Sequence, residues 1–325
     1  MRYSIYRKAG WHPAPTPMTT SSAPGKIILF GEHAVVYGRP ALAVPVTQVH
    51  AYVDISDSAR AGMWIDAPDV NLHAELNTLP SDHPLASVIH NFLFISRVSA
   101  FPNLDIKITS TIPVASGLGS GAAVTVALTR ALASHLKYSV TDEEVNSFTY
   151  EIEKLHHGTP SGIDNTVITY AKPVYFVKGQ PMETFKVGKP FTIVIGDTGI
   201  SAPTKESVGD VRRLWLNDKA RWESVFDKIA EISFTARRAI EQGHWEMLGE
   251  LMNENHQLLQ KLTVSSPDLD NLVSVACNAG ALGAKMSGGG RGGNMIALVT
   301  PDRAETVASA LKKAGARTTI ITQVS

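Results

Sequence analysis

Cysteine is almost absent from this sequence. Cys277 is the single cysteine in 325 residues, so the chain can form no internal disulfide and no cysteine zinc site. The eleven histidines show no H-E-x-x-H or other metal-binding spacing. Such sparse cysteine fits a reducing compartment, and we expect a cytoplasmic protein.

An excess of charge and a long apolar run are missing as well. Thirty basic side chains balance 30 acidic ones, whereas a nucleic-acid-binding protein of this size usually has a basic excess. No apolar run approaches the roughly 20 residues that span a bilayer. Residues 1–17 contain no apolar segment of a secretory signal, and their "HPAPTP" predicts a poorly packed leader. We therefore expect neither a nucleic-acid nor a membrane partner.

The remaining composition is that of a globular protein with a sizeable core, since 44% of residues are hydrophobic and 18% are charged. Residue patterns in the first half predict strands and helices, with one helix starting at the capping box of Thr141 and Glu144. The predicted strands are 26–30, 41–46, 50–56, 104–112, 166–170 and 173–177, and the predicted helices include 84–98 and 122–136.

Long helical patterns dominate the second half of the chain. We predict helices over 204–241, 244–261 and 267–282, another after Pro301, and strands over 191–197, 294–299 and 318–324. The order of these elements predicts an α+β protein with two lobes. We place the leader at 1–17, the N-terminal domain at 18–189 and the C-terminal domain at 190–325.

A glycine loop, "PVASGLGSGAA" at 113–123, leads into an alanine-rich helix. It matches neither the P-loop nor the dinucleotide fingerprint. Its glycines let backbone N–H groups approach an anion, and the helix that follows offers its positive end. Ser120 adds a hydroxyl for a phosphate oxygen or Mg²⁺. The loop therefore predicts anion binding, with a plain strand-to-helix turn as the alternative.

Two carboxylates are candidates for catalysis. Glu153 falls in the last turns of a predicted helix, and Asp164 in the Gly/Pro/Ser-rich turn beyond it. One could hold a metal while the other accepts a proton. The alternatives are a solvent-exposed glutamate and an aspartate that caps the next element.

Two further segments bring candidate ligand contacts. Lys26 is predicted at a strand start after a Pro-Gly turn, with Glu32 and His33 at the strand's other end. Such a lysine can neutralise charge at a phosphoryl-transfer centre. The alternatives are a solvated lysine at position 26 and a plain loop histidine at position 33. The second segment, 285–299, has five glycines in six positions around Arg291 and predicts either close approach to a ligand or a mobile tip.

Together these segments resemble the GHMP kinases, and within them the archaeal-type mevalonate kinases. The resemblance rests on "APGKIILFGEHAVVYG" (23–38), "PVASGLGSGAA" (113–123) and "KMSGGGRGGNMIAL" (285–298), in the family's order. "HGTPSGIDN" (157–165) and "GDTGISAPTKESV" (196–208) favour the mevalonate kinases. The resemblance covers about 20–325.

The resemblance implies a two-lobe fold. Its N-terminal lobe would be like ribosomal protein S5 domain 2 and bind ATP, and its C-terminal lobe would be ferredoxin-like. The implied reaction moves the γ-phosphoryl group of ATP onto the C5 hydroxyl of (R)-mevalonate, with Mg²⁺ as cofactor and a homodimer as the expected assembly. Other GHMP small-molecule kinases (of phosphomevalonate, sugars or homoserine), a decarboxylase of the same fold and a non-catalytic ligand-binding module are the alternatives.

The resemblance also implies roles for single residues. Asp164 matches the catalytic base, Lys26 its charge-stabilising partner, and Glu153 a Mg²⁺ ligand with Ser120 beside it. The nucleotide-binding positions are Pro113, Ala115, Ser116, Gly117, Leu118, Gly119, Ser120, Gly121 and Ala122. The substrate positions are Glu32, His33, Thr204, Gly289 and Arg291.

Two positions depart from the family pattern. Gly121 stands where many members have a serine that binds Mg²⁺, so the metal hydroxyl comes from Ser120 or is replaced by water. Arg291 interrupts a nearly pure glycine segment, where it either reaches a phosphate or the substrate carboxylate or faces solvent.

Overall fold

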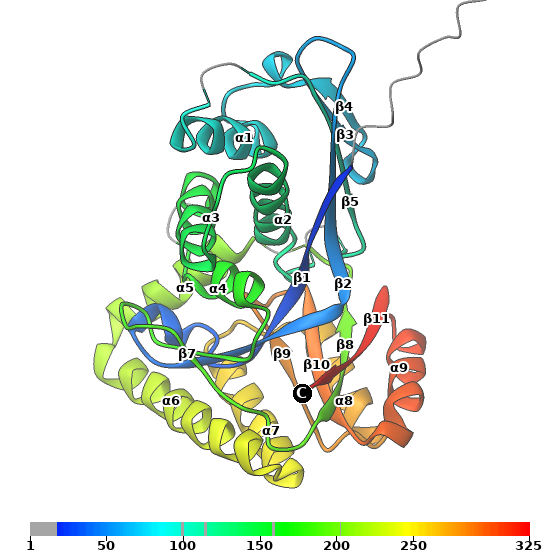
Figure 1. The fold of residues 1–325 in the computed structure, drawn as a ribbon. Coiled ribbons are helices and arrows are strands. Elements are labelled where there is room, and N and C mark those ends of the chain that lie inside the picture. The colour runs from blue at the N-terminus through cyan, green and yellow to red at the C-terminus, as the bar shows by residue number, and fades with distance from the viewer. Residues whose placement is uncertain (1–17, 99–100, 114–115, 158–159, 202) are drawn as a thin grey trace, which may run out of the picture.

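Two β-sheets with helices around them form the protein. The computed structural model describes residues 18–98, 101–113, 116–157, 160–201 and 203–325. The predicted leader, 1–17, lies outside the described residues, and the domain boundary at 189/190 stays a prediction. Figure 1 shows the N-terminal lobe at the top and the C-terminal sheet below it. The long strands β1 (Thr19–Phe30) and β2 (Ala41–Asp57) run from the N-terminal lobe down to the C-terminal sheet.

The N-terminal sheet has the order β4-β3-β5-β2-β6-β7, with β1 pairing along β2. Helices α1 to α4 lie together on one side of this sheet (Figure 1). The elements are β3 (Met63–Ala67), β4 (Leu72–Glu75), α1 (Pro84–Ile95), β5 (Leu104–Ser110), α2 (Ser120–His135), α3 (Asp142–His157), α4 (Ile163–Tyr170), β6 (Val174–Phe176) and β7 (Glu183–Thr184).

The C-terminal sheet is antiparallel with the order β11-β8-β10-β9. With several helices in the crossover from β8 to β9 and one in the crossover from β10 to β11, its connectivity is the β-α-β-β-α-β arrangement of a ferredoxin-like lobe. The elements are β8 (Phe191–Asp197), α5 (Thr204–Asn217), α6 (Lys219–Gln242), α7 (Trp245–Lys261), α8 (Pro267–Asn278), β9 (Gly283–Ser287), β10 (Asn294–Val299), α9 (Ala304–Lys313) and β11 (Thr318–Val324).

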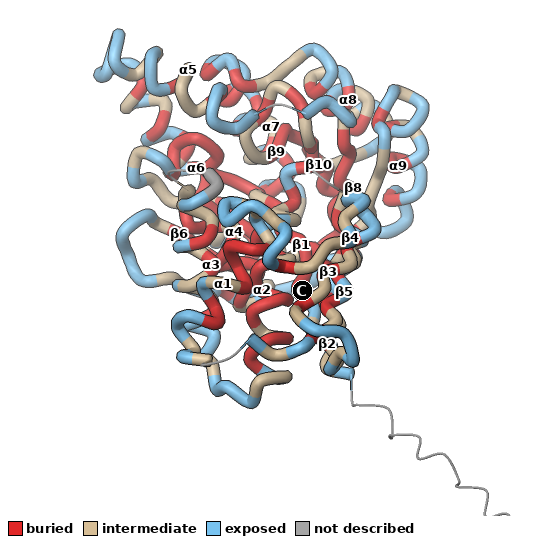
Figure 2. The backbone as a smooth tube through the Cα atoms, turned by 90° about the horizontal axis from the view of Figure 1, so that it is seen from above, coloured by how far each residue is buried: buried red, intermediate tan, exposed pale blue. Residues whose placement is uncertain are grey.

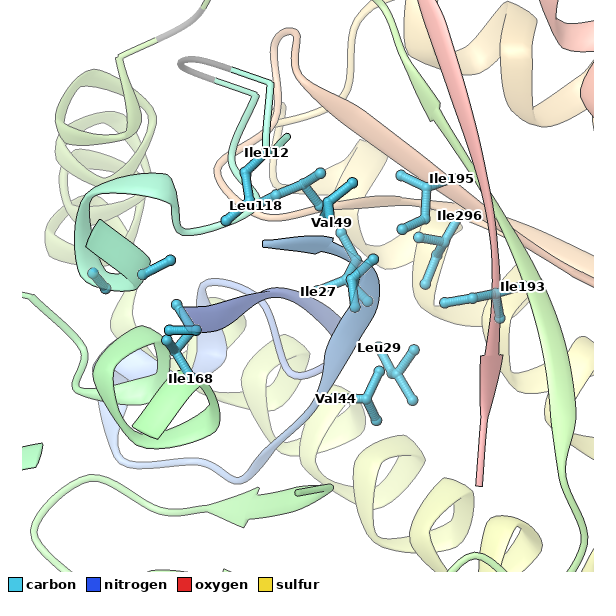
Figure 3. Packing of buried hydrophobic residues seen from close by; sticks show 14 of the residues in the cluster. Ile27, Leu29, Val44, Val49, Ile112, Leu118, Ile168, Ile193, Ile195 and Ile296 are labelled. Atoms are coloured by element: carbon cyan, nitrogen blue, oxygen red, sulfur yellow. The ribbon is translucent and has the colours of Figure 1, made fainter. Parts of the chain in front are cut away.

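One continuous apolar core joins the two lobes. In Figure 3, Ile27, Leu29 and Val44 of the β1–β2 ribbon face Ile195 and Ile296 of the C-terminal sheet. Figure 2 shows the buried chain running through the middle of the molecule, with exposed segments around it. The C-terminal sheet therefore packs directly on β1 and β2. Within the described ranges, no helix is long and apolar enough to cross a membrane.

Several predicted elements are confirmed and others are wrong. The capping box forms, since the Thr141 amide donates to Glu144 (2.8 Å) and the Glu144 amide to the Thr141 hydroxyl (3.2 Å). The predicted strand over 166–170 is part of α4, because Ile163 and Val167 face one apolar cluster at helical spacing.

The remaining errors concern element boundaries and short strands. The predicted helix over 204–241 breaks at Asp218, whose side chain caps α6. The predicted helix over 267–282 ends at Asn278, and β9 follows it. Strands β3, β4, β7 and β9 were not predicted, and predicted strands 41–46 and 50–56 are one continuous strand, β2.

Candidate active site

The glycine loop reaches α2 through two residues that take left-handed backbone angles. Gly117 has φ +79° and Gly119, the N-cap residue of α2, has φ +76°. The loop is fixed to the sheet because the Lys26 amide donates to the Leu118 carbonyl at 2.9 Å. The first turn of α2 begins at Ser120, so its unpaired N–H groups and positive end lie directly after the loop.

Most predicted nucleotide positions lie in this loop or in the first turn of α2. Leu118 and Ala122 are buried in the core, so only their backbone can meet a ligand. Ala115 lies outside the described residues. The other predicted positions in this stretch are Pro113, Ser116, Gly117, Gly119, Ser120 and Gly121.

Lys26 and Asp164 form an ion pair beside the loop. The ammonium Nζ lies 3.1 Å from the Asp164 Oδ1 and donates to the Gly117 carbonyl at 3.1 Å. Lys26 is only 4% exposed, so the solvated alternative is wrong, and it lies within β1 rather than at a strand start. Asp164 lies in the first turn of α4, after Gly162 at φ +92°, and not in a loop.

Gly119 is required where Lys26 crosses the loop. A Cβ atom at this position would lie 2.7 Å from the Ile168 Cδ1 and 3.1 Å from the Lys26 Cγ. A side chain here would therefore displace the lysine stem or the helix that carries Asp164. The loop conformation and the position of the Lys26 ammonium are coupled.

Glu153 reaches the start of α2 from α3. A Cβ atom at Gly121 would lie 3.6 Å from the Glu153 Oε1, so the carboxylate lies against the first turn of α2. Ser120, the first residue of α2, directly precedes Gly121 and carries a hydroxyl. A carboxylate and a hydroxyl are oxygen donors that suit Mg²⁺. Among the described residues, no three His, Cys, Asp or Glu side chains cluster as a metal site.

Glu32 forms a buried ion pair with Lys285 of β9 and joins the two lobes. Glu32 is 1% exposed and Lys285 is 0% exposed. Burial raises the pKa of the Glu32 carboxyl, and the Lys285 ammonium acts against this shift. The Glu32 Oε2 is buried and has no hydrogen-bond partner among the described residues. It is an acceptor without a donor at the junction of the lobes.

His33 follows with left-handed backbone angles (φ +62°) and is also buried. Its Nε2 lies 3.1 Å from the Gly289 carbonyl, which assigns the proton to Nε2. Burial lowers the pKa of His33 to about 4, so the ring is neutral at neutral pH. The Nδ1 is left as a buried acceptor with no partner in the described part of the chain. His33 is therefore a loop histidine, in the turn before residues 34–37, and one that is buried.

The glycine turn between β9 and β10 packs against α5. A Cβ atom at Gly289 would lie 2.8 Å from the hydroxyl of Thr204, the first residue of α5. Arg291 has φ +61°, pairs with Asp210 of α5 and donates to the Thr263 carbonyl at 3.3 Å. The guanidinium is paired within the C-terminal lobe while 33% of the side chain stays exposed to solvent.

Three residues at this junction were not predicted. Lys285 binds Glu32, the Ser287 hydroxyl donates to the Ile28 carbonyl at 2.7 Å, and the Asn294 amide donates to the Ser116 carbonyl. Asn294 thereby connects β10 with the glycine loop, and all three are buried. The available signal was the occurrence of polar residues at both ends of a glycine turn that is otherwise flanked by apolar strands.

Comparisons with known proteins find a family match in each lobe. The GHMP kinases N terminal domain matches residues 86–172, and the GHMP kinases C terminal domain matches 236–317. The chain is 36% identical to mevalonate kinase of Thermococcus gammatolerans, over 94% of this chain and 96% of that protein. It is also 36% identical to mevalonate kinase of Pyrococcus abyssi, over 95% and 96%.

A solved structure extends the similarity to three dimensions. The crystal structure of L. major mevalonate kinase in complex with R-mevalonate matches with a TM-score of 0.83 and 28% sequence identity. The match covers 96% of this chain and 98% of the other. Both lobes are therefore included in the similarity.

Proposed function

Because the chain belongs to the GHMP kinase family, we propose that it transfers the γ-phosphoryl group of ATP to the C5 hydroxyl of (R)-mevalonate. The observation that carries the mechanism is the Lys26–Asp164 pair, 3.1 Å apart beside the glycine loop. A base and a cation at the positive end of a helix suit phosphoryl transfer, in which positioning and charge neutralisation do most of the catalysis.

Asp164 is the base in this mechanism. Its carboxylate takes the proton of the C5 hydroxyl as the hydroxyl oxygen bonds to the γ-phosphorus and the bond to the β-phosphate oxygen breaks. Lys26 orients the carboxylate through the 3.1 Å contact and neutralises charge on the reacting oxygens. The products are 5-phosphomevalonate and ADP, and the proton leaves from Asp164.

The phosphates lie at the glycine loop and the first turn of α2, where backbone N–H groups point outward. Glu153 and Ser120 are the residues that would hold Mg²⁺, because the carboxylate lies against the start of α2. Mg²⁺ supplies charge neutralisation at the phosphates when it is bound. Gly121 offers no hydroxyl, so Glu153 and Ser120 are the side chains from this region that would hold the ion.

The substrate side of the site consists of Glu32, His33 and Thr204, with Gly289 and Arg291 in the turn behind them. Two buried acceptors, the Glu32 Oε2 and the His33 Nδ1, have no donor among the described residues. Buried acceptors are costly when unpaired. Mevalonate carries two hydroxyl groups, so its hydroxyls can donate to acceptors of this kind.

An unphosphorylated substrate is favoured over phosphomevalonate by the charges at the site. The cations Lys26, Lys285 and Arg291 are each already paired with a carboxylate. The phosphate group of phosphomevalonate would need further basic residues. The ion pair of Lys26 and Asp164 also favours a kinase over a decarboxylase or a non-catalytic module.

A substrate panel tests the proposal. Purified protein with ATP and Mg²⁺ is assayed against (R)-mevalonate, phosphomevalonate, galactose and homoserine, with ADP release as the readout. We expect turnover with mevalonate that exceeds turnover with each other substrate. Turnover only with another substrate, or release of CO₂, would refute it.

The assembly and location complete the proposal. We expect a homodimer in the cytoplasm, the latter supported by the single cysteine. Light scattering of the purified protein measures the mass directly, and a mass of one chain would refute the dimer.

A further inference from the structure

Four charged side chains of alternating sign lead from the C-terminal sheet into the site. Lys285 of β9 contacts Glu32, whose carboxylate is attracted by Lys26, and Lys26 contacts Asp164. Only the last member is substantially exposed, since Lys285, Glu32 and Lys26 are all buried. The far end of this series, Lys285, has no role in the mechanism described above.

Three contacts fix the Lys285 ammonium. It pairs with Glu32, donates to the Met286 carbonyl at 2.6 Å and lies 5.9 Å from the centre of the Phe30 ring. Its neighbour on the same face of β9 is Ser287, which binds the backbone of β1. Strand β9 therefore supplies both a charged and a neutral contact to the N-terminal lobe.

We propose that Lys285 is a positioning residue of the phosphoryl-transfer site, holding the buried Glu32 carboxylate ionised and oriented so that its second oxygen faces the substrate. The proposal rests on the function proposed above. Lys285 touches neither reactant and acts through Glu32. One Glu32 oxygen is bound to the ammonium, and the other, Oε2, is a buried acceptor without a partner in the described structure.

Among the groups around Glu32, Lys285 is the main cation that stabilises the charged carboxylate. Lys26, the other cation that acts on Glu32, is in contact with Asp164. The neighbouring His33 is neutral because burial lowers its pKa to about 4. His256 of α7 is a further titratable group on this side. Burial lowers its pKa, although the nearby Asp270 acts in the opposite direction. A buried carboxylate without a close cation takes up a proton instead of staying charged.

Removal of the Lys285 ammonium should therefore raise the pKa of the Glu32 carboxyl. Without Lys285, the pKa of Glu32 rises further, because burial is left without its largest opposing influence. An opposite charge at contact distance changes a carboxyl pKa by about one to three units. The acid limb of the kcat/KM profile, which reports groups of the free enzyme, should move to higher pH by a similar amount.

The test compares Lys285→Met and Lys285→Gln with Ser287→Ala. The first two remove the charge, and glutamine keeps a hydrogen-bond donor in case the methionine variant does not fold. Ser287→Ala removes a contact between the lobes from the same face of β9 but leaves the charges intact. The readout is kcat/KM for mevalonate between pH 5 and 9, with circular dichroism to verify folding.

We expect each neutral Lys285 variant that folds to shift the acid limb upward by about one unit or more, which is about tenfold lower kcat/KM at a pH on that limb. Ser287→Ala should keep the wild-type limb. An unshifted limb in a folded Lys285 variant, or an equal shift in Ser287→Ala, would overturn the role of Lys285. Wild-type protein without any mevalonate turnover would instead refute the proposed function.

Discussion

Replacement of Gly119 by alanine is the sharpest structural perturbation of the site. The new Cβ would lie 2.7 Å from the Ile168 Cδ1 and 3.1 Å from the Lys26 Cγ, in a backbone conformation with φ +76°. The left-handed conformation costs about 1–2 kcal/mol for a residue with a side chain. Overpacking adds about 1–3 kcal/mol. We expect Gly119→Ala to lower the free energy of unfolding by about 2–5 kcal/mol.

Gly179→Ala is the matched control. Gly179 lies in the turn between β6 and β7 with φ +80°, and a Cβ there meets no atom within 4 Å. Its cost should be the conformational part alone, about 1–2 kcal/mol. The difference between the two variants, measured by urea unfolding, isolates the contact with Lys26 and Ile168.

The same pair of variants links packing to catalysis. Because alanine at 119 displaces Lys26, kcat for mevalonate should fall by roughly 100-fold, the effect of a misplacement of about 1 Å. Gly179→Ala should keep the wild-type kcat. Equal unfolding free energies for the two variants, together with an unchanged kcat in Gly119→Ala, would refute the coupling between the loop and Lys26.

Three further predictions concern single side chains. Lys26→Met should lower kcat by roughly 100-fold or more in the ADP-release assay, because it removes the cation at the reacting oxygens; a loss confined to KM would contradict this role. The folded-state pKa of His33, about 4, lies below its ordinary value of 6.5, so the unfolded chain binds more protons in this window and stability falls as the pH drops through it. Wild type should therefore lose about 3 kcal/mol more than His33→Asn between pH 7 and pH 4 in urea unfolding, and parallel curves would contradict the burial of a neutral ring. Asn294→Ala should raise KM for ATP about three- to tenfold with a smaller change in kcat, because one hydrogen bond to the glycine loop is lost; an unchanged KM for ATP would argue against Asn294 as a support of the loop.

The long periodic segments of the fold were predictable from the sequence, and short segments were not. The capping box at Thr141 marked the start of α3, and the apolar run at Phe191 marked β8. The run 166–170 is too short for its residue pattern to distinguish a strand from a helix. It forms part of a helix in which Val167 is buried. Strand β9 carries the buried Lys285, which has no strand signal of its own.

Part of the candidate site was also predictable from the sequence, and part of it was not. The resemblance singled out Lys26 and Asp164, and the structure brings them to 3.1 Å. Single-residue statistics favoured a solvated Lys26 and a plain loop histidine at position 33, yet contacts between distant segments bury both side chains. The link from Lys285 to Glu32 joins positions 253 residues apart, and only the packing of the two lobes creates it.

The most direct measurement of the central claim is the initial rate of ATP-dependent mevalonate phosphorylation by wild type and by Asp164→Asn, with the product identified by ³¹P NMR. Asn keeps the shape of the side chain but cannot accept the hydroxyl proton. We predict a phosphomonoester at C5 from the wild type and a rate lower by at least about 100-fold in the variant. Absence of this product from wild type, or an equal rate from Asp164→Asn, would contradict a mevalonate kinase site built on Lys26 and Asp164.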